Sequence, residues 1–128
     1  MTPEKITKRI VNKVKRLRKL DPNIEIAGMG IAIGKGPNGR ITADNGGRIC
    51  GMGALLVGHG NKIYDIGKHA TGPRSTYAHP IAHLLKITIP QASALEWGFM
   101  NYRGHDNTGL DEEFFNAGLE ARWQVNAR

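Results

Sequence analysis

The first twenty residues carry a pattern that constrains the fold more than any other part of the chain. Apolar side chains recur there at spacings of four, four and three, which places them along one side of an α-helix. Thr2 suits the capping position and Pro3 the first helical position. The sequence therefore predicts an amphipathic helix over residues 1–20, with an apolar stripe made of Ile6, Ile10, Val14 and Leu17.

The same segment holds all of the chain's net charge. The segment contains eight Lys and Arg residues and a single acidic residue, Glu4. Its net charge of +7 equals the formal net charge of the 128-residue chain. At about 100° per residue, Arg18 and Lys13 flank or enter the stripe, whereas the other cations fan across the opposite side. A one-sided cationic helix can select an acidic partner. The predicted anion-binding residues are Lys5, Lys8, Arg9, Lys15, Arg16 and Lys19.

Length and composition indicate one domain spanning residues 1–128, with a core that needs no disulfide. Cys50 is the one cysteine and has no partner for a disulfide within the chain, and the start of the chain lacks an apolar signal region. We therefore expect a cytoplasmic protein. The longest apolar run is far shorter than the roughly 20 residues that cross a bilayer, so no membrane insertion is expected.

Glycine is concentrated in residues 28–60, which hold eleven of the 17 glycines. Residues 31–33 and 40–42 flank a turn-forming segment and predict a short Gly-rich β-hairpin. Gly34, Gly36 and Gly39 also spell a dinucleotide-binding pattern, but the residues that follow form helix poorly, so a hairpin turn is favoured and no cofactor is expected. Residues Cys50 to Val57 predict a buried helix, although their length alone does not exclude a strand.

Residues 61–78 lack a regular pattern and predict a loop, in which Lys68, His69 and Arg74 are candidate additional contacts to a partner. Residues 79–128 predict a helical C-terminal part. Pro80 and Pro90 open two helices joined by a tight turn at Thr88, and the last helix is expected to start from Thr108 as cap, with Asp111 completing a capping box. The predicted fold is mostly α, of the α+β class.

Candidate metal and catalytic residues favour structural roles. His79 and His83 are spaced to share one helical face, but no glutamate follows the first histidine as zinc-dependent hydrolysis requires, and no tight cysteine pair anchors a structural zinc. No metal is therefore expected. Cys50 is an outside candidate for a catalytic thiol, with a base drawn from His59, His69 or His79. Its apolar and glycine-rich flanks favour a buried structural thiol.

The segment from Asp44 to Leu56 contains a Cys-x-x-Gly-Ala-Leu motif starting at Cys50, and Trp97 to Asn101 form a second, weaker match. In these motifs and in the order of its elements, the chain resembles a set of small uncharacterised bacterial and phage proteins. The resemblance implies a mostly helical fold and a packing role for Cys50 and Gly53. It brings no activity with it.

Three functions remain open from the sequence. The first is a small accessory protein that holds nucleic acid or an acidic protein on its basic helix and acts by binding. The second is a protein interaction module or homo-oligomer that docks through the apolar stripe. The third, and lesser, is a hydrolase that uses Cys50.

Overall fold

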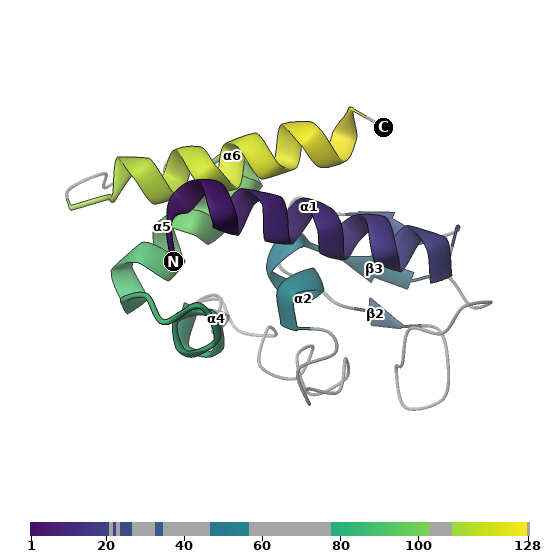
Figure 1. Cartoon of the computed structure of the whole chain (residues 1–128), viewed down its shortest axis with the longest axis horizontal. Helices are drawn as coiled ribbons and strands as arrows, with labels where there is room; N and C mark the ends of the chain where they lie inside the picture. The colour runs from purple at the N-terminus through teal and green to yellow at the C-terminus, as the bar shows by residue number, and fades with distance from the viewer. Residues whose placement is uncertain are drawn as a thin grey trace.

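The structure is a computed structural model that describes residues 1–20, 22, 24–26, 33–34, 47–56, 78–102 and 109–127. Figure 1 shows helix α1 lying across the molecule with α6 alongside it, and α2, α4 and α5 below or behind. The elements in chain order are α1 (Pro3–Leu20), β1 (Ile24–Ile26), β2 (Ile33–Gly34), β3 (Gly47–Ile49), α2 (Gly51–Leu56), α4 (Ala78–Leu85), α5 (Ile89–Met100) and α6 (Glu112–Asn126). The prediction of a mostly helical fold is confirmed.

The N-terminal helix forms as its sequence predicts. The Thr2 side chain accepts a hydrogen bond from the backbone N–H of Lys5 at 3.4 Å, and the Thr2 carbonyl accepts one from the N–H of Ile6 at 3.1 Å. All four residues of the apolar stripe are buried, Ile6 and Ile10 completely. Burial of this stripe fixes α1 to the body of the protein and turns its opposite side outward.

Helices α1 and α6 run in the same direction. Residues near the start of α1 contact residues near the start of α6, and the two ends also meet. The Thr7 hydroxyl donates to the carbonyl of Ala117 at 2.9 Å, and the Arg18 guanidinium donates to the carbonyl of Val125 at 2.8 Å. The last turn of α6 contains no basic residue of its own. Arg18 therefore supplies positive charge to the negative end of the α6 dipole.

Helices α5 and α6 approach each other closely at two glycines. A Cβ added to Gly98 would overlap the backbone carbonyl of Phe115, and one added to Gly118 would overlap that of Leu95. Beside this crossing, the Arg122 guanidinium donates to the carbonyl of Phe99 in the last turn of α5 at 2.8 Å. Isolated glycines within helices often have such a packing reason.

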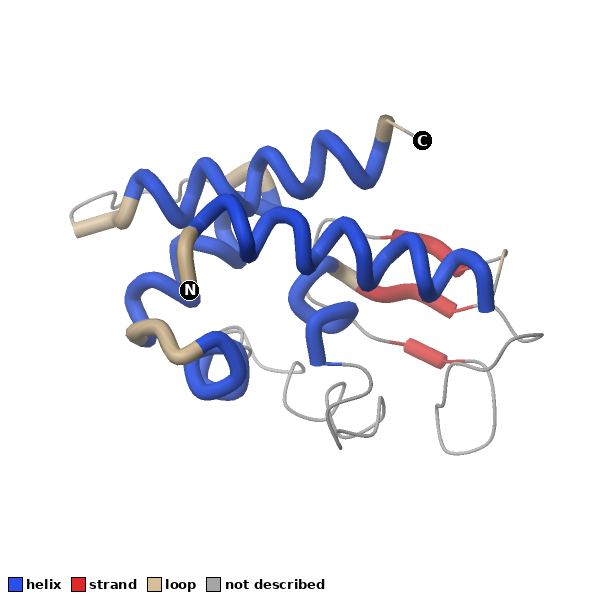
Figure 2. The backbone as a smooth tube through the Cα atoms, in the orientation of Figure 1, coloured by secondary structure: helices blue, strands red, loops and turns tan. Residues whose placement is uncertain are grey.

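Among the described residues, three short strands form one sheet in the order β1-β3-β2, near the C-terminal end of α1 (Figure 2). β1 pairs parallel with β3, and β2 pairs antiparallel with β3, so that Ile33 lies opposite Arg48. The sequence predicted that residues 31–33 pair with residues 40–42, which lie outside the described part. Within the described residues the partner of β2 is β3, a segment for which the sequence analysis predicted no strand.

The starts of the C-terminal helices differ from the prediction in detail. α4 begins at Ala78, two residues before Pro80. Thr88, for which the sequence predicted a turn, is also the N-cap of α5. Its side chain and that of Gln91 form a capping box there. The cap of α6 is Asp111, whose carboxylate accepts from the N–H of Phe114 at 3.3 Å. The prediction that Asp111 is the third helical residue is therefore wrong; Thr108 lies outside the described residues.

The core gathers the inner faces of α1, α2, α5 and α6 around large buried side chains that include Leu55, Leu95, Phe99 and Phe115. Among the described residues, no helix is both long enough and apolar enough to cross a membrane.

Candidate polyanion-binding surface

The outward side of α1 carries a shallow hollow of about 370 Å³. We call it the basic hollow; the described residues that line it are Lys5, Lys8, Arg9, Asn12, Lys13 and Arg16. Four of them are among the six cations predicted from the sequence, and they are exposed except for the half-buried Arg9. No carboxylate occurs among these lining residues. The buried stripe on the other side of α1 explains why they all point away from the core.

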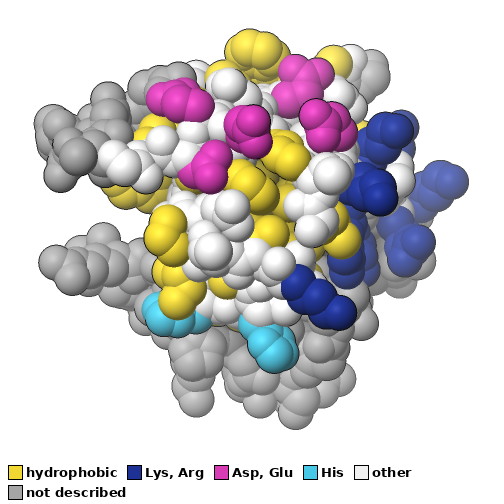
Figure 3. Space-filling model, turned by 60° about the vertical axis from the view of Figure 1, so that its left-hand side comes forward, with side chains coloured by type: hydrophobic (Ala, Val, Ile, Leu, Met, Phe, Trp, Pro, Cys, Tyr) yellow, Lys and Arg dark blue, Asp and Glu magenta, His cyan; other side chains and the backbone are white. Residues whose placement is uncertain are grey.

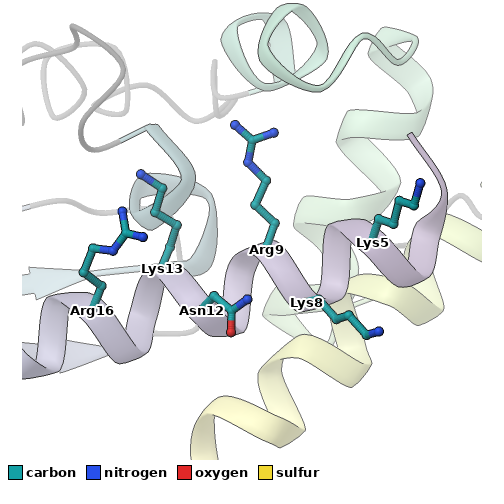
Figure 4. Close-up of a pocket in the computed structure, with 6 residues that line it drawn as sticks. All are labelled: Lys5, Lys8, Arg9, Asn12, Lys13 and Arg16. Atoms are coloured by element: carbon teal, nitrogen blue, oxygen red, sulfur yellow. The ribbon is translucent and has the colours of Figure 1, made fainter.

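The side chains of the basic hollow point to two sides of α1. Figure 4 shows Arg9, Lys13 and Arg16 reaching toward one side of α1, whereas Lys8 extends to the other side. Like charges three or four residues apart on a helix each cost about 0.2–0.5 kcal/mol. Arg9 and Lys13 form such a pair, and so do Lys13 and Arg16. The arrangement therefore works against the intrinsic stability of α1.

The pKa of Lys13 in the basic hollow is lowered. Partial burial lowers the pKa of its ammonium group, and the positive charges of Arg16 and Arg9 lower that pKa further. Both neighbours act through space because all three side chains occupy the same side of the helix (Figure 4). An anion placed among them would relieve this repulsion.

Acidic side chains gather elsewhere on the surface. The first turn of α6 presents Glu112 and Glu113 next to the cap Asp111, where negative charge stabilises the positive end of the helix dipole. Figure 3 shows acidic side chains together on one face and Lys and Arg side chains along its edge, with little mixing of the two. Among the described residues on this face, basic and acidic side chains therefore occupy separate regions.

The structure separates Lys15 and Lys19 from the other predicted cations. They line a second hollow of about 480 Å³ between α1 and the end of α6, together with Arg18 and with the apolar Val11 and Val14. Charges at this position lie near the C-terminal end of α6, where positive groups stabilise the helix. A structural role therefore accounts for part of their placement.

Cys50 lies in the core at the start of α2. The residue is 2% exposed, and its sulfur accepts a hydrogen bond from the N–H of Gly53 at 3.4 Å. Burial raises the pKa of the thiol to about 11, outweighing the opposing effect of the backbone N–H groups. A catalytic thiol needs access to its substrate and a substantial thiolate fraction, and Cys50 has neither in this structure.

Ionisation of Cys50 makes stability depend on pH in the alkaline range. Below pH 9.0 the thiol is protonated in the folded and unfolded chains alike. Between pH 9.0 and about 11 only the unfolded chain ionises, so the free energy of unfolding falls as pH rises, by up to about 3 kcal/mol from this group. Urea titrations of the wild type and of Cys50→Ala across this range isolate the contribution, because the variant lacks it. Equal pH dependence in the two proteins would contradict the assignment.

The remaining candidate residues do not form a site in the described part of the chain. His79 and His83 are both exposed on α4. Among the described residues no three His, Cys, Asp or Glu side chains lie close enough to hold a metal ion. His59 and the predicted loop contacts Lys68, His69 and Arg74 lie outside those residues.

Sequence reasoning missed two residues of the basic hollow, Asn12 and Lys13. Lys13 was placed at the edge of the apolar stripe, and its partial burial agrees with that position. A long lysine side chain can nevertheless bury its stem and carry its charge outward. Asn12 is uncharged, so charge patterning does not reveal it, although it lies between Arg9 and Arg16 on the exposed side.

Comparisons with protein-family models, with curated proteins and with solved structures found no match, so the candidate function depends on the chemistry of this surface.

Proposed function

We propose that this protein binds nucleic acid, or another polyanion, through the basic hollow of α1. The observation that carries the proposal is a surface hollow lined by five cations and one amide, with no carboxylate among its described lining residues. A solvated helix face more commonly mixes charges of both signs. The proposed action is binding, without chemical conversion of the partner.

The physical basis of this binding is the release of counterions from phosphates. Each Lys or Arg that neutralises a phosphate frees a condensed cation, which gives affinity without selecting a base sequence. The apolar stripe anchors α1 along its length, since Ile6 and Leu17 are both buried. The cations are therefore presented on a fixed helix instead of a flexible tail, which lowers the entropy cost of binding.

A fluorescence-polarisation titration of the full chain tests the proposal. The probes are a fluorescein-labelled duplex and a single strand of the same sequence, at about 50 mM salt. We expect saturable binding of at least one probe in the micromolar range or tighter, typical of electrostatic association. Absence of binding to both probes at this low salt concentration would overturn the proposal for nucleic acid.

The alternative of docking through the apolar stripe has less support. Val14 is 1% exposed and Leu17 8%, so a partner would reach the stripe only after α1 left the core.

We also propose a reducing, cytoplasmic location, which the free thiol of Cys50 supports.

A further inference from the structure

Within the basic hollow, Lys13 is under the electrostatic influence of Arg9 and Arg16, and we call these three residues the cationic triad. The three residues are spaced at i, i+4 and i+7, so they cover about 10 Å along the helix axis. Figure 4 shows their side chains extending to the same side of α1, with Lys5 a further turn away. Partial burial is the largest cause of the lowered pKa of Lys13, and the charges of Arg16 and Arg9 lower that pKa further.

The charge of this cluster exceeds what one linking phosphate of a nucleic acid strand supplies. A phosphodiester carries a single negative charge, whereas a phosphate monoester carries about −1.5 to −2 near pH 7 and offers three strong acceptor oxygens. The fork-shaped guanidinium groups of Arg9 and Arg16 suit two-point hydrogen bonding to such oxygens, and the Lys13 ammonium adds a compact charge between them. A monoester therefore matches the triad better than a diester.

We propose that the cationic triad binds the terminal phosphate monoester of a nucleic acid strand. Lys5, one turn closer to the N-terminus than Arg9, then meets a phosphodiester that follows along the strand. This inference depends on the proposed function and refines it, because it assigns the strongest contact to the end of the strand.

The test compares two oligonucleotides that differ only in the group at the 5′ end, phosphate or hydroxyl, both labelled at the 3′ end. For the wild-type chain we expect the phosphorylated strand to bind about 10-fold more tightly, the gain of one additional charge-assisted contact. Lys13→Gln should remove this preference, and Lys15→Gln, which removes the same charge outside the triad, should keep it. Arg16→Gln is the second triad variant, at an exposed position, and circular dichroism verifies that each variant is folded.

The outcomes separate this inference from the proposed function. Equal affinity for the two strands would overturn the terminal-phosphate site and leave the polyanion surface standing, whereas binding of neither strand would remove both. A preference that persists in both triad variants would place the site elsewhere. A phosphoserine peptide serves as a competitor, and its binding more tightly than the phosphorylated strand would overturn the identification of nucleic acid as the partner.

Discussion

Gly118→Ala is expected to lower the free energy of unfolding by about 3 kcal/mol or more, the upper range for overpacking. The added methyl group would overlap the backbone carbonyl of Leu95, and a backbone cannot move aside as a flexible side chain can. Intrinsic helix propensity predicts the opposite sign, because alanine is favoured over glycine in a helix by about 1 kcal/mol. Urea unfolding therefore decides whether the contact between α5 and α6 or local propensity dominates.

A second glycine variant and a control variant test the same contact. Gly98→Ala should be destabilising by a similar amount, since its Cβ would meet the carbonyl of Phe115 on the other side of the same crossing. Asn116→Ala is the control, because Asn116 lies on the exposed side of α6. We expect its effect to stay within about 0.5 kcal/mol. Stabilisation by either glycine substitution would show that the two helices are not in close contact there.

The second large effect concerns binding. Simultaneous replacement of Lys5, Lys8 and Arg16 by glutamine is expected to weaken duplex binding by about 10²-fold or more at roughly 0.1 M salt, since three phosphate contacts and their counterion release are lost. All three residues are exposed, so their replacement leaves the core intact. Fluorescence polarisation measures the affinity, and thermal unfolding confirms that the variant is folded.

A matched control removes the same amount of positive charge from positions outside the basic hollow. Replacement of Lys15, Lys19 and the exposed Lys86 by glutamine also lowers the net charge by three, but leaves the basic hollow unchanged. We expect this control to retain most of its affinity. If both triple variants lost affinity equally, the partner would respond to overall charge, and the assignment of binding to the basic hollow would be wrong.

The parts of the fold that the sequence predicted well are those with a local signal. The spacing from Ile6 to Leu17 identified α1 and its buried side, and the apolar residues after Cys50 identified α2. The short strands had no comparable signal, because β1 pairs with β3 across about twenty intervening residues. Strands of two or three residues are too short to display a period of their own.

Other features depended on contacts between distant residues. In the sequence, Gly98 and Gly118 are only residues of low helix propensity. The structure shows that they allow the close contact between α5 and α6. Arg122 belongs to α6, yet its guanidinium donates to the carbonyl of Phe99 in the neighbouring helix α5. The candidate site shows the same dependence. Helical periodicity identified four of the five cations of the basic hollow, but the packing of α6 places Lys15 and Lys19 in a different hollow.

The dependence of duplex binding on salt concentration tests the central claim most directly. A plot of the logarithm of the binding constant against the logarithm of salt concentration should have a slope of about −4 to −5 if the five cations of the basic hollow together neutralise about five phosphate charges of the duplex. For the variant lacking Lys5, Lys8 and Arg16 the slope should shrink to about −2. A wild-type slope near zero, or a slope that the triple replacement leaves unchanged, would contradict binding of a phosphate backbone by this surface.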